Sequence, residues 1–126
     1  MGRDRQWRNG AGVLRITERD ASAPVSAPVP VEIAASYGAR RRGLLGRDGI
    51  KGAILLTPCN SVHTFRMRFS IDVAYLDREL RVVDVHTMKP GRFGRPRLRA
   101  RHVLEAEAGA MAAWGLRPGV RLAIDV

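Results

Sequence analysis

The stretch that decides the fold is Thr64–Asp77, TFRMRFSIDVAYLD, in which apolar and polar side chains alternate over most of its length. The odd positions are apolar and hold Phe65, Met67, Phe69, Ile71, Val73 and Tyr75, whereas positions 66, 68, 70 and 72 are polar. Side chains of a β-strand point to its two faces in turn, so this pattern predicts a strand with one core face and one polar face. Residues 77–79 predict a turn into a second strand, Leu80–Val85, which completes an antiparallel hairpin.

The segments around this hairpin predict further short strands and two short helices. Strands are expected at 31–34, 53–56, 98–105 and 120–126, and residues 13–16 would add an edge strand. Ser36 is placed to cap a helix over residues 37–45 that Gly46 ends, and residues 106–114 favour a second helix that Gly115 ends. The predicted fold class is α+β: a compact, β-rich single domain, mainly an antiparallel sheet or small barrel of about six strands with two short helices.

A proline-rich segment divides the chain into two unequal parts. Residues 21–30, ASAPVSAPVP, contain three prolines among small residues, a composition typical of an extended linker. We therefore predict an N-terminal extension and linker over residues 1–30, partly flexible, and one globular domain over residues 31–126.

The composition is that of a single globular domain with a strong positive charge. The chain has 126 residues, a net charge of +10, 45% hydrophobic residues and 27% charged residues. It holds too few residues for two full cores and is too apolar for wholesale disorder. The charge favours an anionic partner but specifies no reaction.

The sequence also excludes several classes of protein. No run reaches the roughly 18 to 20 apolar residues of a membrane span, so we expect no integral membrane contact. Charged residues interrupt residues 1–20, which is unlike a secretory signal, and we expect a cytoplasmic protein. Cys59 is the single cysteine, so it can form no intramolecular disulfide. No short metal-ligand spacing is present, and we expect neither a metal site nor a cofactor.

Four separated segments, in order, resemble the family of bacterial and archaeal proteins called domain of unknown function 192. RRRGLLGR at 40–47 is similar to its R-x-x-G-L-M-x-R, and HTFRMRFSIDVAYLD at 63–77 to its Met- and Asp-containing strand motif. ARHVLEAEAG at 100–109 resembles R-x-V-L-E-x-x-A-G, and WGLRPGVRL at 114–122 the closing G-I-x-x-G-D. The resemblance implies a β-rich α+β domain and no particular reaction. Asp72 and Glu105 fall on positions that match the family pattern.

Two groups of residues are candidates for binding small ligands or for catalysis. On the expected strand, Arg68, Ser70 and Asp72 would share one face, and with Glu105 and His63 they would form a polar ligand-binding pocket. The alternative is a solvated sheet face with cross-strand ion pairs.

Cys59 and His63 are close enough in sequence to act as a thiolate nucleophile and its base, but the orienting group and oxyanion site of an enzyme are not visible. The simpler interpretation is a buried cysteine beside a structural histidine.

A third candidate is the basic segment between His86 and His102, which contains no acidic residue. In an extended conformation Arg97, Arg99 and Arg101 would project to one side and could follow a phosphate backbone. An exposed loop in an arginine-rich chain is an equally good interpretation. The anion-binding or nucleic-acid-binding candidates are Lys89, Arg92, Arg95, Arg97, Arg99 and Arg101.

Because no catalytic set is complete, the leading hypothesis is a non-enzymatic binding or accessory domain. Its arginine-bearing face would recognise an anionic small molecule or protein. The first alternative is RNA binding through residues 89–101. The second is a small hydrolase that uses Cys59 and His63, or Asp72.

Overall fold

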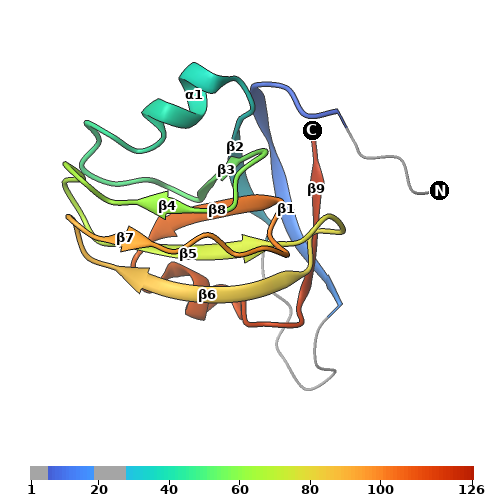
Figure 1. Ribbon diagram of the computed structural model, residues 1–126. Helices are drawn as coiled ribbons and strands as arrows, with labels where there is room; N and C mark the ends of the chain where they lie inside the picture. The colour runs from blue at the N-terminus through green and yellow to red at the C-terminus, as the bar shows by residue number, and fades with distance from the viewer. Residues whose placement is uncertain (1–5, 19–27) are drawn as a thin grey trace.

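The computed structural model describes residues 6–18 and 28–126, and these ranges form nine strands and two helices (Figure 1). The elements in chain order are β1 (Gly10–Glu18), β2 (Val29–Ala34), α1 (Tyr37–Arg42), β3 (Ala53–Leu56), β4 (Val62–His63), β5 (Ile71–Leu76), β6 (Val82–Met88), β7 (Phe93–Gly94), β8 (His102–Glu107), α2 (Ala110–Trp114) and β9 (Arg121–Asp125). The strand-rich α+β fold with two short helices is confirmed. No helix in the described ranges is long and apolar enough to cross a membrane.

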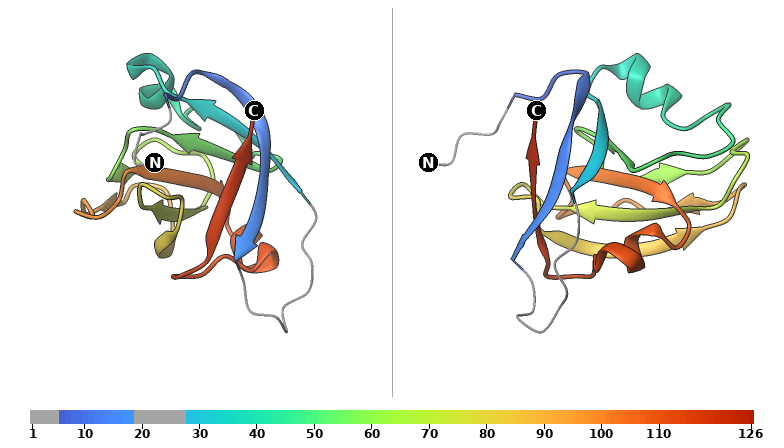
Figure 2. Two further views of the ribbon diagram at one scale, coloured as in Figure 1. Left: turned by 90° about the vertical axis from the view of Figure 1, so that its right-hand side faces the viewer. Right: turned by 180° about the vertical axis from the view of Figure 1, so that it is seen from behind.

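Seven strands form one sheet in the order β6-β5-β8-β3-β2-β1-β9. Every neighbouring pair is antiparallel except β2 and β3, which makes the sheet mixed. The sheet curls into a half-barrel (Figure 2). The turn before β6 meets the start of β9, where Val82 N donates to Val120 O at 2.7 Å and Leu122 N to Leu80 O at 2.9 Å.

Strand β1 is interior to the sheet. It pairs with β2 on one side and with β9 on the other, so the expectation that residues 13–16 form an edge strand was wrong. Residues 21–27, most of the proline-rich segment, lie outside the described residues, and Val29 and Pro30 already belong to β2.

The hairpin of β5 and β6 is confirmed, with Ile71 opposite Met88 and Leu76 opposite Val82. The predicted polar face is wrong, however, because all six residues of β5 are buried. Val73 and Tyr75 pack into one apolar cluster with β4 and the loops around it, and Ala74 and Leu76 pack into a second cluster inside the curled sheet. An interior strand that is covered on both faces buries the residues of both faces. The alternation of apolar and polar residues does not reveal that a strand is covered in this way.

The predicted strand also begins too early. Between His63 and Ile71 the chain turns, and Arg66 has a φ of 63°, in the left-handed region that few residues other than glycine adopt. Met67 is buried and Phe65 is exposed, so the alternation of residues 64–70 reflects a folded loop with some core anchors.

Helix α1 begins where the sequence predicts. The Ser36 hydroxyl accepts a hydrogen bond from Ala39 N at 3.2 Å, as an N-cap does. The helix ends at Gly43, which has a φ of 42°, and not at Gly46 as expected. Leu44, just after the helix, is buried, whereas Tyr37 at its start is exposed.

Candidate functional site

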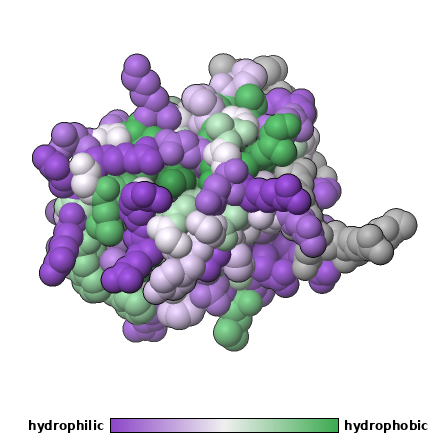
Figure 3. Space-filling view, turned by 90° about the horizontal axis from the view of Figure 1, so that it is seen from above, coloured by the Kyte–Doolittle hydropathy of each residue, from purple (hydrophilic) through white to green (hydrophobic). Residues whose placement is uncertain are grey.

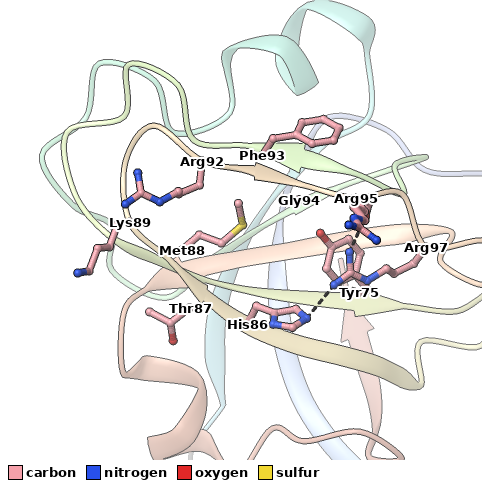
Figure 4. Close-up of a pocket in the computed structure, with 10 residues that line it drawn as sticks. All are labelled: Tyr75, His86, Thr87, Met88, Lys89, Arg92, Phe93, Gly94, Arg95 and Arg97. Atoms are coloured by element: carbon pink, nitrogen blue, oxygen red, sulfur yellow. Dashed lines mark hydrogen bonds between the residues drawn. The ribbon is translucent and has the colours of Figure 1, made fainter.

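A basic pocket of about 590 Å³ lies beside β7 (Figure 4). This volume is typical of small-ligand sites. The pocket is lined by residues of β5, β6, β7 and the loops at both ends of β7, namely Tyr75, His86, Thr87, Met88, Lys89, Arg92, Phe93, Gly94, Arg95 and Arg97. We call this set the basic pocket. Four of its side chains are cationic, and none is acidic.

A buried threonine fixes the turn that carries Lys89 and Arg92. The Thr64 hydroxyl donates to Lys89 O at 2.6 Å and accepts from Arg92 N at 2.8 Å. The Thr64 backbone N–H also donates to Arg92 O at 2.8 Å. Thr64 is fully buried, so these bonds exchange little with water. The backbone of the turn that carries Lys89 and Arg92 is therefore held in place by Thr64.

Tyr75 and Gly94 meet at one side of the pocket. A Cβ atom on Gly94 would lie 2.6 Å from the Tyr75 hydroxyl, so only glycine allows β7 to approach this closely. The Arg97 guanidinium carbon lies 4.4 Å from the centroid of the Tyr75 ring, in cation–π geometry. Burial raises the pKa of Tyr75 although the nearby Arg97 opposes the rise, so the phenol stays neutral at physiological pH.

Asp84, His86 and Arg97 form a small polar cluster at the rim. Asp84 Oδ2 lies 2.8 Å from His86 Nε2 and 3.2 Å from Arg97 Nη2. His86 Nε2 also lies 2.7 Å from Arg97 Nη2, and one nitrogen cannot donate to Asp84 and accept from Arg97 at once. Partial burial opposes ionisation of Asp84, but hydrogen bonds from His86 and Arg97 outweigh it and lower the pKa of this carboxyl.

The remaining cations of the pocket have no acidic partner among the residues that the structure describes. Within residues 6–18 and 28–126, Lys89, Arg92 and Arg95 form no ion pair. Some arginines elsewhere are paired, namely Arg15 with Asp125, Arg47 with Glu32 and Arg68 with Asp48. Unpaired cations around a hollow concentrate a positive electrostatic potential there, and this potential attracts anions.

The structure brings together four of the six predicted basic residues. Lys89, Arg92, Arg95 and Arg97 line the pocket, whereas Arg99 and Arg101 do not. Residues 95–101 form a loop that contains a turn and not a strand, so the expected alternation of Arg97, Arg99 and Arg101 on one side is wrong.

The structure does not bring Asp72 and Glu105 together. Asp72 stands opposite Ala106 on β8, whereas Glu105 stands opposite Val73, so the two carboxylates point to opposite faces of the sheet. Asp72 accepts from Gly109 N at 2.9 Å, Met111 N at 3.1 Å and Thr87 Oγ1 at 2.7 Å, and it therefore caps α2 from another strand.

Glu105 is a buried carboxyl that is 6% exposed. Its carboxyl forms no hydrogen bond with any residue in the described ranges, and a Cβ on Gly43 would lie 4.0 Å from its Oε1. Burial raises the pKa of Glu105 from 4.5 to about 7. The carboxyl is a feature of the core below the end of α1 and is not part of the basic pocket.

The remaining predicted residues lie apart from Asp72 and Glu105. The Arg68 side chain pairs with Asp48 and donates to Gly46 O at 3.3 Å. The His63 ring stacks on Phe65 with 4.9 Å between centroids.

Cys59 lacks the surroundings of a nucleophile. Its thiol donates to Ser61 O at 3.1 Å, and burial raises the pKa of the thiol, which disfavours the thiolate. No hydrogen bond between Cys59 and His63 is present in the described part of the chain. The same residues contain no cluster of three metal-binding side chains.

Thr64, Tyr75, His86 and Gly94 belong to the pocket or its frame, and sequence reasoning did not place them there. Thr64 and Tyr75 resemble ordinary strand residues, and their role depends on the chain segment folded against them. The one available signal was the glycine at position 94, next to an aromatic residue and between arginines.

Comparison with known proteins gives relatives without an established activity. A UPF0127 protein of Pyrococcus horikoshii is 39% identical over 84 residues, which is 63% of this chain and 73% of the relative. A UPF0127 protein of Pyrococcus furiosus is 32% identical over 99 residues, 75% of this chain and 85% of the relative.

Two solved structures share the fold at low sequence identity. A candidate transcription regulator of Sinorhizobium meliloti has a TM-score of 0.76 at 19% identity, covering 94% of this chain and 97% of its own. A protein of unknown function from Novosphingobium aromaticivorans has a TM-score of 0.71 at 16% identity, covering 88% and 83%. The profile of the domain of unknown function 192 family (DUF192), described as "Uncharacterized ACR", matches residues 17–124, and the chain therefore belongs to this family.

Proposed function

We propose that this protein is a non-enzymatic binding domain that takes an anionic small molecule, or an anionic group of a partner, in the basic pocket. The observation that supports the proposal is the set of cations around a preformed hollow of about 590 Å³ with no acid on its lining. Arg92 and Arg95 can each present two parallel N–H groups to a phosphate or carboxylate, and Lys89 adds a point charge.

The pocket also provides the neutral groups that orient a ligand. Met88 and Phe93 contribute apolar surface, whereas the Tyr75 ring is only 1% exposed and the Thr87 hydroxyl already donates to Asp72. A few polar groups placed on an apolar lining are the usual composition of a specific ligand site. Arg97 differs from the other cations because it is already paired with Asp84, and an anion would compete with that carboxylate.

Calorimetric titration with inorganic pyrophosphate tests the proposal. The double variant Arg92→Gln, Arg95→Gln removes two cations of the pocket and is expected to weaken binding at least about tenfold. Arg99→Gln is the matched control, because it removes one charge from the same segment outside the pocket, and it should change affinity less than about twofold. Equal losses in Arg99→Gln and in Arg92→Gln alone would show that only the overall charge matters and would contradict the proposal.

A further inference from the structure

An aromatic platform of three exposed rings stands beside the basic pocket. We define it as His63, Phe65 and Phe93. His63 and Phe93 are directly opposite in the antiparallel pair β4–β7, so their side chains point to the same face. Phe65 stacks on His63 with an interplanar angle of 19°. The exposed fractions are 48% for Phe65 and 61% for Phe93, and His63 is also exposed.

Such a surface needs an explanation because large rings of this kind are ordinarily buried. The residues opposite each other on the inner face of the same pair, Val62 and Gly94, face the core, and Val62 is buried. The pair β4–β7 therefore uses its inner face for packing and its outer face for presenting rings. Three neighbouring exposed rings differ from single scattered apolar residues, which require no function.

The platform and the pocket are physically continuous. Phe93 borders the pocket on the side opposite His86 and Thr87, and its ring points away from Tyr75 and Met88, to the outer face of β7 (Figure 4). Thr64, between His63 and Phe65, holds the turn that carries Lys89 and Arg92 through the hydrogen bonds described above. One ligand can therefore contact both the rings and the cations.

The charged residues on the two segments that form the platform have one sign. The two segments that contribute its rings, residues 59–70 and 85–102, contain no acidic residue. They contribute Arg66, which follows Phe65 in the chain, and Arg92 and Arg95 on either side of β7. Figure 3 views the molecule from the side on which α1 lies, and long hydrophilic side chains alternate there with apolar patches.

We infer that the anionic ligand of the basic pocket is a single-stranded nucleic acid, whose phosphates lie at the cations and whose bases stack on the aromatic platform. This inference rests on the function proposed above. Exposed rings that alternate with cations match the alternation of flat bases and phosphates along a strand. A duplex fits poorly, because its bases already stack on each other and offer no free faces to the rings.

Fluorescence anisotropy with three labelled 12-mers tests the inference: a mixed-sequence RNA, the DNA of the same sequence, and an abasic deoxyribose-phosphate strand of equal length. The variant Phe65→Ala, Phe93→Ala removes two exposed rings and should not disturb the core. We expect it to lose at least about fivefold affinity for the strands that carry bases and to bind the abasic strand as the natural protein does. Arg92→Gln, Arg95→Gln should weaken binding of all three strands.

Tyr37→Ala serves as the matched control, because Tyr37 is an exposed aromatic residue on α1 outside the platform, and its loss should change no affinity. If the natural protein binds base-carrying and abasic strands equally, the phosphates alone are recognised; the inference then fails and the proposed function stands. The same conclusion follows if pyrophosphate binds and no strand does, or if a duplex binds more tightly than either single strand. If neither pyrophosphate nor any strand binds, both proposals fail.

Discussion

The Asp72 carboxylate accepts a hydrogen bond from the backbone N–H of Gly109 at 2.9 Å, although the two residues are 37 positions apart. Gly109 is the N-cap of α2 and has no side chain to bond the first N–H groups of the helix. A residue of the interior strand β5 therefore takes the place of the missing cap. This explains why the family-like Asp72 is buried under α2 and does not face a ligand.

Replacing this carboxylate should destabilise the protein strongly. Asp72→Ala removes three hydrogen bonds and leaves buried donors unsatisfied, so we expect a loss of about 2 to 4 kcal/mol in the free energy of unfolding. Urea denaturation measures the loss. Asp48→Ala is the control, because this carboxylate is 82% exposed and pairs only with the exposed Arg68. A loss for Asp72→Ala no larger than that for the control would contradict the capping role.

Glu105 should make stability depend on pH. Its folded-state pKa of about 7 lies above the ordinary value of 4.5, so between these values the folded state holds more protons than the unfolded state. The free energy of unfolding should therefore fall as pH rises through this window, by up to about 3 kcal/mol. Outside the window Glu105 should contribute no pH dependence.

Glu105→Gln is the variant that tests this dependence. An amide stays neutral, so the variant should match the natural protein near pH 4 and exceed its stability near pH 8. Thermal unfolding across the range provides the comparison, and Glu79→Gln, on the surface, should leave the slope intact. If the stability of Glu105→Gln changes with pH as steeply as that of the natural protein, other groups cause the pH dependence.

Thr64 should contribute to both stability and binding. Thr64→Val keeps the shape of the side chain but leaves Lys89 O and Arg92 N without their buried partner. We expect a loss of about 1 to 3 kcal/mol in stability, together with weaker pyrophosphate binding at temperatures where the variant remains folded. Thr17→Val, whose hydroxyl bonds Arg121 O at the surface, is the control. Unchanged affinity in folded Thr64→Val would show that the turn holds its geometry without the threonine.

The close approach of Gly94 to Tyr75 predicts a rescue. Gly94→Ala places a methyl carbon 2.6 Å from the Tyr75 hydroxyl oxygen, which is too close, and should therefore destabilise the protein. The double variant Gly94→Ala, Tyr75→Phe removes the hydroxyl and should recover much of that stability, since the next nearest atom to the added carbon is 3.4 Å away. Additive losses in the double-mutant cycle would refute this steric account.

Asp84 should reduce the affinity of the pocket for anions. Its carboxylate holds Arg97 at 3.2 Å and competes with any anion for that guanidinium. Asp84→Asn removes the competing charge, so pyrophosphate should bind about two- to tenfold more tightly in calorimetric titration. Asp77→Asn, which removes a carboxylate from the turn before β6, provides the comparison. Weaker binding by Asp84→Asn would instead mean that Asp84 positions Arg97 for the ligand.

The sequence by itself determined the β-rich α+β class, the hairpin of β5 and β6, the Ser36 cap and the positive charge of residues 89–101. Each of these depends on neighbours in the chain: side-chain alternation, a capping residue before a helix, or a count of charges. The family followed from motifs in order, which also need no tertiary contact.

Only the tertiary structure decided which faces are buried and which cations share a site. The alternation of apolar and polar residues cannot show that β5 is covered on both sides. It therefore predicted a polar face for Asp72, although this residue caps α2. The pocket depends on a turn held by Thr64 and on β7 pressed against Tyr75, and these contacts join residues far apart in the chain. They form because burial favours closing the sheet and covering it, a free energy that belongs to the whole chain and not to any segment.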